Sequence, residues 1–424
     1  MLDIKFIKEN SQLVKKNIEK KFQNHKLQLV DRLTASHDKL VSLKKEGDEL
    51  RAQRNKLSQE INQRKKQNKD IKDLLELAKN LPNKIIQIEE ETAKVGKEML
   101  LIQRQIPNII HKSVPIGKDE TKNKVAKKFG VPQKFSFKVK NHVELAENLC
   151  IADFESSAKT SGKGFYYLDG KLAELNQALL RFGVDFMIKK KYQLVEPPLM
   201  IRKKVIEGVL SFEEFENMIY KVENEDLYLI GTSEHSLIGR FIDQVIPEKM
   251  LPIKLVSVTS CFRKEIGSHG INEKGLWRTH QFNKVEQIIL CKPKDSEKYY
   301  KEILNNSIEL YRKLKIPIRQ LEICSGDLGD LKSKQADIEA YRPTTKNYEE
   351  VGSCSNLTDA QARRLNIKTI TEKGEKYFPH TLNNTAIATS RAMVAILENY
   401  QQKDGSIKIP AVLQKYAKFK KIAK

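Results

Sequence analysis

Residues 262–287 read FRKEIGSHGINEKGLWRTHQFNKVEQ, and they predict two β-strands joined by a long loop. The overlapping stretch KLVSVTSCFRKE, residues 254–265, alternates between apolar and polar side chains as a half-buried strand does. Gly267, Gly270 and Gly275 punctuate the polar residues that follow, which is typical of a flexible loop. A hairpin would therefore bring the two ends of the quoted stretch together.

The charged and aromatic residues of this hairpin are expected on one face of a sheet. Arg263 and Glu265 are two residues apart, so they point the same way in a strand. Arg278, Phe282 and Glu286 follow at even spacing and also share a face. Two guanidiniums, an aromatic ring and two carboxylates can hold a polyphosphate, stack a flat base and accept an amine or hydroxyl. An exposed strand face with salt bridges carries the same residue types, so this segment alone leaves both interpretations open.

A second segment places a cation at the start of a helix. Residues 380–401, HTLNNTAIATSRAMVAILENYQ, predict a polar strand followed by an apolar helix, with Thr389 and Ser390 as caps. Arg391 then lies in the first turn, where its charge opposes the helix macrodipole. An anionic ligand at the helix start would reverse that penalty, and an arginine turned back to solvent is the alternative.

A third segment offers oxygen ligands for a metal ion. In residues 337–356, DIEAYRPTTKNYEEVGSCSN, the side chains of Glu349, Glu350 and Ser353 cluster on a predicted strand. Carboxylate and hydroxyl oxygens suit Mg²⁺ that bridges nucleotide phosphates. Paired glutamates are also common on protein surfaces, so the pattern by itself decides nothing.

Composition limits the class of protein. The chain has 424 residues, 39% of them hydrophobic, which is enough for two or three domains with a real core. A net charge of +22 favours a polyanionic partner, either nucleic acid or an anionic membrane surface, although a lysine-rich proteome gives the same bias. We see no long apolar run and no hydrophobic segment behind the first methionine, so we expect a cytoplasmic protein without a membrane partner. The five cysteines are scattered, so neither disulfides nor structural zinc is expected.

From about residue 27 to residue 106 the pattern predicts an antiparallel two-helix coiled coil. Apolar side chains recur at alternating steps of three and four, which one helix cannot bury alone. The predicted seam of the second helix is Leu74, Ala78, Leu81, Ile85, Ile88, Thr92, Val95, Met99, Ile102 and Ile106. Between the helices, the basic residues 62–70 are expected at the exposed tip, and Pro82 predicts a kink or a late helix start. Such an arm can be a dimerisation or spacer element, or it can lie along a nucleic-acid backbone.

The rest of the chain predicts an α+β domain. Pro107, Pro115 and Gly117 end the coiled-coil pattern, so residues 1–106 form the arm and residues 107–130 a linker. In residues 131–424, strand-like and helical patterns mix irregularly, without the regular alternation of a doubly wound sheet. We therefore expect an antiparallel β-sheet flanked by helices.

Taken together, these segments resemble a class II aminoacyl-tRNA synthetase and, within that class, a seryl-tRNA synthetase. The helical arm is similar to the tRNA-binding arm of that family. YQLVEPPLM, residues 192–200, resembles the first class motif, residues 262–287 the second and residues 382–413 the third. GTSEHSL, residues 231–237, resembles the TxE loop that is most particular to this family. The resemblance covers essentially the whole chain.

The resemblance implies that ATP lies against the predicted hairpin. Arg263 would bridge the α-phosphate and the carboxylate of serine, and Glu265 would meet the adenine edge. Phe282 and Arg391 would sandwich the adenine ring, an arrangement suited to a planar guanidinium. Arg278 and Arg391 would hold the γ-phosphate. Arg263, Arg278 and Arg391 are therefore the expected catalytic side chains.

The resemblance also implies a metal site and a homodimer. Glu350 and Ser353 would bind Mg²⁺ and, with it, ATP. Pro198 would belong to the dimer interface. One departure is LKSKQADIEAYRP, where many relatives carry a Lys-Tyr pair before the acidic residue, and this leaves the details of the strand near Asp337 open.

The implied serine site uses polar side chains from several segments. Thr232 and Glu234 would bind the ammonium group, while Glu286 and Thr385 would receive the hydroxyl group. The expected serine-binding residues are Thr232, Glu234, Arg263, Glu286, Asn383 and Thr385.

The implied reaction is ATP-dependent activation of L-serine to seryl adenylate and transfer to the 3′ end of tRNA(Ser), which the arm would bind. Whether tRNA(Sec) is also charged stays open. One alternative is a non-catalytic synthetase paralogue that binds tRNA or protein, which the presence of Arg263, Glu350 and Arg391 disfavours. The other is a class II synthetase for a different amino acid, which the implied serine site disfavours.

Overall fold

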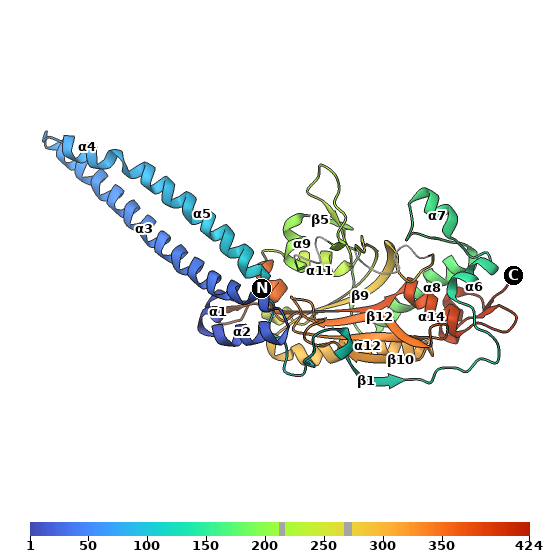
Figure 1. Ribbon diagram of the computed structural model, residues 1–424. Coiled ribbons are helices and arrows are strands. Elements are labelled where there is room, and N and C mark those ends of the chain that lie inside the picture. Colours follow the sequence, from blue (N-terminus) through green and yellow to red (C-terminus); the bar gives the residue numbers. More distant parts are fainter. Residues whose placement is uncertain (212–216, 267–273) are drawn as a thin grey trace. The chain divides into compact units, whose positions relative to one another are not determined.

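The computed structural model describes residues 1–211, 217–266 and 274–424 (Figure 1). Two compact units are distinguished by their internal contacts. The arm unit comprises Leu2–Glu19 and Gln23–Pro107, and the sheet unit comprises Met1, Lys20–Phe22 and Asn108–Lys424. Gly267 and Gly270 of the predicted loop lie outside the described residues.

The arm unit is a helical hairpin. Its helices are α1 (Ile4–Glu9), α2 (Ser11–Lys20), α3 (Leu27–Lys66), α4 (Lys72–Lys79) and α5 (Leu81–Gln105). α3 packs along α5, as the repeat of apolar residues predicted. α3 extends through Lys66, so its connection to α4 is shorter than the predicted tip. The predicted second helix is divided at Asn80, and Pro82 lies in the first turn of α5, where its missing N–H breaks no helical hydrogen bond.

The α3–α5 seam combines apolar packing with cross-helix ion pairs. Leu33 and Leu40 of α3 and Ile85, Val95 and Ile102 of α5 are buried. Three ion pairs tie exposed flanks of the two helices: Lys39–Glu91 at 2.6 Å, Arg51–Glu89 at 2.9 Å and Arg32–Glu98 at 3.3 Å. Because exposed pairs contribute little, the apolar seam holds the hairpin together and the charges favour this register.

The sheet unit is built on eight strands in the order β1-β10-β11-β12-β15-β9-β8-β4. The strands are β1 (Lys124–Phe129), β10 (Ile318–Glu322), β11 (Lys334–Arg342), β12 (Asn347–Asn356), β15 (His380–Ala388), β9 (Gln281–Cys291), β8 (Ile253–Phe262) and β4 (Gln193–Leu194). Adjacent strands are antiparallel except for β4 and β8. The antiparallel sheet is confirmed, and β1 is an edge strand formed by residues predicted as linker.

Helices cover both faces of this sheet. The helices described in the sheet unit as a whole are α6 (His142–Asn148), α7 (Phe154–Thr160), α8 (Gly170–Lys189), α9 (Lys203–Val209), α11 (Ser233–Gly239), α12 (Ser296–Lys313), α13 (Ala360–Arg364), α14 (Thr389–Asn399) and α15 (Ala411–Ala417). Val285 and Ile289 of β9 belong to the large core with α8, α12 and α14. Ile288 and Leu290, on the opposite face, belong to the core with α9, α11 and α13. The even-numbered face of β9 is thus covered only toward its end, which leaves its first half to line a cavity.

The shorter strands form small separate sheets. They are β2 (Ala152–Asp153) with β3 (Tyr167–Leu168), β5 (Met200–Ile201) with β6 (Tyr228–Leu229), and β16 (Ile407–Lys408) with β17 (Lys421–Ile422). β7 (Val245–Pro247), β13 (Lys368–Ile370) and β14 (Lys376–Tyr377) make a three-stranded sheet. Within the described part of the chain, we find no helix with the length and apolar character needed to cross a bilayer.

The predicted hairpin is present as β8 and β9, with Cys261 opposite Phe282 and Ser257 opposite Glu286. β8 ends at Phe262, however, so Arg263 and Glu265 lie beyond the strand. Glu265 adopts φ 53°, a left-handed conformation in which strand alternation does not hold. The shared strand face predicted for these two residues is therefore wrong, although both reach the same cavity.

The predicted helix after β15 is α14, with Arg391 in its first turn. Thr389 and Ser390 are not its N-cap, because that position is Ala388 and makes no side-chain hydrogen bond. Thr389 Oγ1 instead donates to the carbonyl of Asn283 at 3.2 Å, which ties the helix start to β9.

Candidate active site

Two adjoining cavities lie against the even-numbered face of β9. The first lies between residues 263–265 and 277–282 on one side and the start of α14 on the other, and the second, of about 290 Å³, extends toward α11. Arg263, Lys284, Glu350 and Thr385 line both. Every residue predicted to bind ATP or serine lines one or both cavities: Arg263, Glu265, Arg278, Phe282, Glu350, Ser353, Arg391, Thr232, Glu234, Glu286, Asn383 and Thr385. Residues from four separate segments thus converge, while their roles stay predictions.

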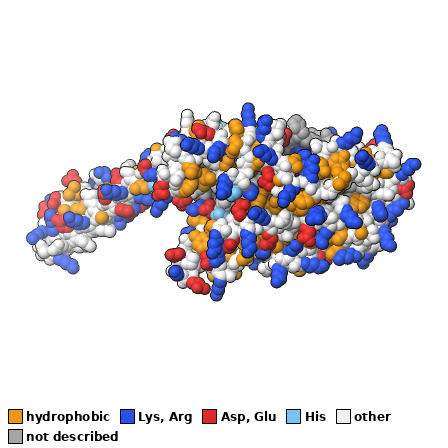
Figure 2. Space-filling view, turned by 90° about the horizontal axis from the view of Figure 1, so that it is seen from below, with side chains coloured by type: hydrophobic (Ala, Val, Ile, Leu, Met, Phe, Trp, Pro, Cys, Tyr) orange, Lys and Arg blue, Asp and Glu red, His pale blue; other side chains and the backbone are white. Residues whose placement is uncertain are grey.

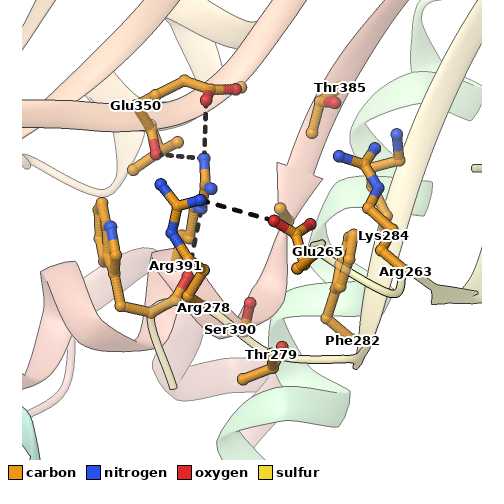
Figure 3. A pocket seen from close by; sticks show the side chains of 14 residues that line it. Arg263, Glu265, Arg278, Thr279, Phe282, Lys284, Glu350, Thr385, Ser390 and Arg391 are labelled. Atoms are coloured by element: carbon orange, nitrogen blue, oxygen red, sulfur yellow. Dashed lines mark hydrogen bonds and ion pairs between the residues drawn. The ribbon is translucent and has the colours of Figure 1, made fainter. Parts of the chain in front are cut away.

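Arg278 and Arg391 lie together on one side of the first cavity (Figure 3). Arg391 Nη1 is 2.9 Å from Glu350 Oε2 and donates to the Glu350 carbonyl at the same distance. Arg278 Nη1 is 3.6 Å from Glu265 Oε2. Burial opposes both charges of the Arg391–Glu350 pair, but their mutual attraction outweighs it, raising the pKa of Arg391 and lowering that of Glu350. The cations are thereby held ready for an anion that would take the place of carboxylates.

Arg263 lies across the cavity from these two, beside Phe282 and Lys284 (Figure 3). Its guanidinium carbon is 5.4 Å from the centre of the Phe282 ring, within the range of a cation–π contact. Arg263 Nε also donates to the carbonyl of Gly231 at 3.1 Å, which orients the side chain. A flat, negatively charged molecule would meet an aromatic face and cations from opposite walls.

A β-bulge brings Glu350 and Ser353 to the same cavity. The β11–β12 register shifts so that Ile338 faces Gly352 while Glu339 faces Glu350, which leaves Val351 as the extra residue. Side chains three apart can then share a face, which simple alternation forbids. The neighbouring Glu349 instead bonds Arg342 Nη1 at 2.9 Å and does not join Glu350 in the cavity lining.

The donor set near Glu350 fits a magnesium ion that is shared with a nucleotide. Asp337 faces Ser353 across the β11–β12 ladder, so two carboxylates and a hydroxyl line one end of the second cavity. Burial and the charge of Glu350 raise the pKa of Asp337 to about 7. Among the described residues, no three His, Cys, Asp or Glu side chains are grouped to hold a metal by themselves. Mg²⁺ is commonly held by one or two carboxylates plus phosphate oxygens, so this set suits it only with a phosphate present.

Acidic side chains and Lys284 line the other end of the second cavity. Glu286 is paired with Lys284 at 2.6 Å, and their side chains are only 2% and 7% exposed. Thr385 Oγ1 donates to the same Glu286 oxygen at 3.3 Å. Burial, with the charge of Glu286, raises the pKa of Glu234 to about 7, although Gln361 Nε2 donates to it at 2.6 Å. This end can receive a small molecule with an ammonium group and a hydroxyl.

Sequence reasoning missed several side chains of this site. Lys284 could have been found, since it is two residues from Glu286 and shares its strand face. Trp277 and Lys332 also line the cavities, but they lie in irregular segments without a pattern. His235 lines the second cavity with its ring buried, and burial and the charge of Arg263 lower its pKa to about 3, so it is neutral.

Pro198 lies away from these cavities, in a separate apolar pocket. Val195, Ile201, Val205 and Leu237 line that pocket with it. Pro198 also accepts a hydrogen bond from Ser236 Oγ at 2.6 Å, which ties the segment to α11. Its assignment to a dimer interface stays a prediction.

Comparison with known proteins gives matches over both units. Residues 1–110 match the seryl-tRNA synthetase N-terminal domain, and residues 218–400 match the tRNA synthetase class II core domain for G, H, P, S and T. The chain is 45% identical to a serine–tRNA ligase of Methanospirillum hungatei over 98% of both chains.

Solved structures agree with this. A crystal structure of seryl-tRNA synthetase from Pyrococcus horikoshii complexed with ATP matches with a TM-score of 0.93 and 42% identity, covering 100% of this chain and 99% of that one. The cytoplasmic serine–tRNA ligase from Naegleria fowleri in complex with AMP matches with a TM-score of 0.86 and 31% identity, covering 100% and 98%. The resemblance read from the sequence is thereby confirmed, and the chain belongs to the seryl-tRNA synthetase family.

Proposed function

We propose that this protein uses ATP and Mg²⁺ to activate L-serine as seryl adenylate and then transfers the seryl group to the 3′ end of tRNA(Ser). The observation that carries the proposal is the convergence of Arg263, Arg278 and Arg391 on one cavity that continues into an acidic pocket beside Glu234 and Glu286. The cationic part suits a triphosphate and the acidic part an amino acid with a polar side chain.

Positioning and charge neutralisation drive the first step, and no side-chain nucleophile is required. The serine carboxylate attacks the α-phosphorus in line, the bond to the bridging oxygen breaks, and pyrophosphate leaves. Arg263 reaches both cavities and bridges the carboxylate and the α-phosphate, while Arg278 and Arg391 neutralise the γ-phosphate. Mg²⁺ held by Glu350 and Ser353 would neutralise further phosphate charge when bound. A ribose hydroxyl of tRNA then attacks the acyl carbon and AMP leaves.

Selection of serine rests on its two polar groups. The ammonium group lies against Thr232 and Glu234, and the hydroxyl group reaches Glu286 and Thr385, with Asn383 beside them. Alanine leaves the buried polar groups of Glu286 and Thr385 without that partner, and sites of this kind reject such analogues by about 10⁴-fold. Threonine carries one methyl group more and is excluded by shape.

The helical arm is proposed to bind tRNA through its backbone and shape. Basic side chains lie at the free end of the arm (Figure 2), and Lys65, Lys66, Lys69 and Lys72 are exposed there. Such contacts neutralise phosphates without reading bases, so binding is expected to weaken with salt. The proposed place of action is the cytoplasm, where tRNA is charged for translation.

We further propose that two copies of the chain form a homodimer. The segment after β4 exposes the apolar side chains of Leu199 and Met200, at 38% and 45%, beside the pocket that Pro198 lines. Exposed apolar surface of this kind favours burial against a second copy. Sedimentation is expected to give twice the chain mass of 48.9 kDa.

Attachment of labelled serine to tRNA tests the proposed function. The full chain is expected to charge tRNA(Ser) when ATP and Mg²⁺ are both present, and tRNA(Sec) is assayed beside it. An Arg391→Ala variant that still binds tRNA serves as the control and is expected to lose charging. Tight tRNA binding without any charging by the wild-type protein would support a non-catalytic paralogue instead.

A further inference from the structure

A buried set of polar side chains contacts residues 275–277, which precede β9. It consists of His142 at the start of α6, Glu398 near the end of α14 and Arg342 at the end of β11. Their side chains are 8%, 0% and 10% exposed, and none belongs to the cavity lining described above. The proposed chemistry leaves these polar groups without a role.

His142 holds the backbone of this segment. Its Nε2 accepts a hydrogen bond from the N–H of Leu276 at 3.1 Å. Gly275 adopts φ +141°, and a Cβ there would lie 2.4 Å from Nε2, so only glycine permits this approach. Because Nε2 accepts, the ring proton lies on Nδ1, which is 3.5 Å from Glu398 Oε1. A capping box between Asn141 and Glu144 fixes the helix start that carries the ring.

Glu398 joins His142 to Arg342. Arg342 Nη2 donates to Glu398 Oε1 at 2.7 Å, and Thr344 Oγ1 donates to Oε2 at 2.6 Å. Burial opposes its charge, but the nearby His142 and the hydrogen bonds from Arg342 outweigh that effect and lower the pKa of Glu398 to about 2. The carboxylate therefore stays charged and anchors both partners.

Arg342 connects the set to the ATP-binding arginines through Trp277. Its guanidinium carbon lies 4.6 Å from the centre of the Trp277 ring. The guanidinium carbon of Arg391 lies 5.4 Å from the centre of the same ring, and Arg391 Nε donates to the Trp277 carbonyl at 3.4 Å. The next residue along the chain is Arg278, paired with Glu265. Trp277 thus lies between the buried set and two cations of the proposed phosphate site.

We propose that His142, Glu398 and Arg342 are positioning residues that hold Trp277 and, through it, Arg278 and Arg391 in the geometry that binds ATP. This inference rests on the proposed function, because it assigns these contacts to the ATP side of the same site. Loss of the set is expected to weaken ATP binding while the affinity for serine stays nearly unchanged.

The test uses Trp277, which is the only tryptophan of the chain, as its own fluorescent reporter. The full chain is titrated with ATP and Mg²⁺, and the emission gives Kd. His142→Asn removes the acceptor for the Leu276 N–H and is expected to raise Kd for ATP about tenfold, the usual cost of an unpaired buried donor. His142→Gln places an acceptor oxygen near the position of Nε2 and is expected to stay within about twofold of wild type.

Two further variants separate positioning from general stability. Arg342→Lys keeps a positive charge beside Glu398 but removes the planar guanidinium that lies over the Trp277 ring. It is therefore also expected to raise Kd for ATP. Asn306→Ala is the matched control. Asn306 is buried in α12, does not line the cavities, and its Nδ2 donates to Gln287 Oε1 at 3.0 Å. It is expected to lower the melting temperature without changing Kd for ATP. KM values for ATP and serine in pyrophosphate exchange provide a second readout.

The expected result is a rise in Kd and KM for ATP in His142→Asn and Arg342→Lys, rescue in His142→Gln and an unchanged KM for serine. Equal ATP affinity in all variants would overturn the inference. So would equal losses for ATP and serine that track the melting temperature and appear in Asn306→Ala. A wild-type protein that does not bind ATP would contradict the proposed function itself, a result distinct from both.

Discussion

Lys284 and Glu286 form a salt bridge that is almost entirely shielded from water. Burying two charges is costly, and their attraction offsets this only while both are present. We expect Lys284→Met to destabilise the protein by about 3–5 kcal/mol, because it leaves a buried carboxylate without its cation. Urea unfolding measures this change. Lys204→Met, at an exposed pair with Asp243, is the control and is expected to cost less than about 1 kcal/mol. Equal effects of both substitutions would contradict the buried-pair explanation.

Glu234 is expected to make serine binding depend on pH. With a pKa of about 7, raised by burial and Glu286, it is charged above neutrality and protonated below. Lowering the pH from about 8 to about 6 should therefore raise KM for serine, because the ammonium group loses its anionic partner. Glu234→Gln is expected to bind serine weakly and to lose most of this dependence. We expect the pH dependence of KM that remains in this variant to come from Asp337, whose pKa is also about 7. An undiminished pH dependence in Glu234→Gln would exclude Glu234 as its source.

At the scale of elements, the helical arm shows what periodicity can predict. The alternating apolar steps predicted α3 and α5, and Pro82 predicted the break before α5. The bulge at Val351 was not predictable, because it follows from register with β11 rather than from local sequence. The left-handed conformation of Glu265 was not predictable from local sequence either, since it is accompanied by a tertiary contact with Arg278. The family resemblance still named Glu265, Glu350 and Ser353 as site residues, and all three line the cavities, although strand alternation alone would have misplaced them.

The position of Pro82 gives a test at this scale. In the first turn of α5, Pro82 interrupts no helical hydrogen bond, so Pro82→Ala is expected to change arm stability by less than about 1 kcal/mol. Glu90→Pro, at an exposed interior site of the same helix, is the contrasting control and is expected to cost about 3 kcal/mol or more. Thermal unfolding followed by helical circular dichroism distinguishes them. A large gain in stability from Pro82→Ala would mean that the proline interrupts a helix.

The two proposed tasks of the protein, amino-acid activation and tRNA binding, belong to different units. The cavities lie in the sheet unit, while tRNA binding is assigned to the arm. The cross-helix neighbours Leu40 and Gly96 give a clean place to shorten the hairpin, since a Cβ on Gly96 would lie 3.9 Å from Leu40 Cδ1. Residues 41–95 can thus be replaced by a short turn that keeps the base of the arm.

The shortened protein is expected to form seryl adenylate at nearly the wild-type rate and to charge tRNA at least about 100-fold more slowly, because most phosphate contacts are lost. Pyrophosphate exchange and tRNA charging measure the two steps. Replacing Lys65, Lys66, Lys69 and Lys72 by glutamine in the full arm is the companion variant, expected to reduce the salt dependence of tRNA binding. Undiminished charging by the shortened protein would contradict the proposed role of the arm.

Amino-acid-dependent exchange of pyrophosphate into ATP, with serine, threonine and alanine compared at equal concentration, tests directly whether this cavity activates serine. Convergent arginines beside an acidic pocket predict rapid exchange with serine and rates lower by about 10⁴-fold with alanine. Loss of the serine signal in Arg263→Ala would tie it to this cavity. No exchange with any of the three, or faster exchange with threonine or alanine than with serine, would contradict the proposed activation of serine.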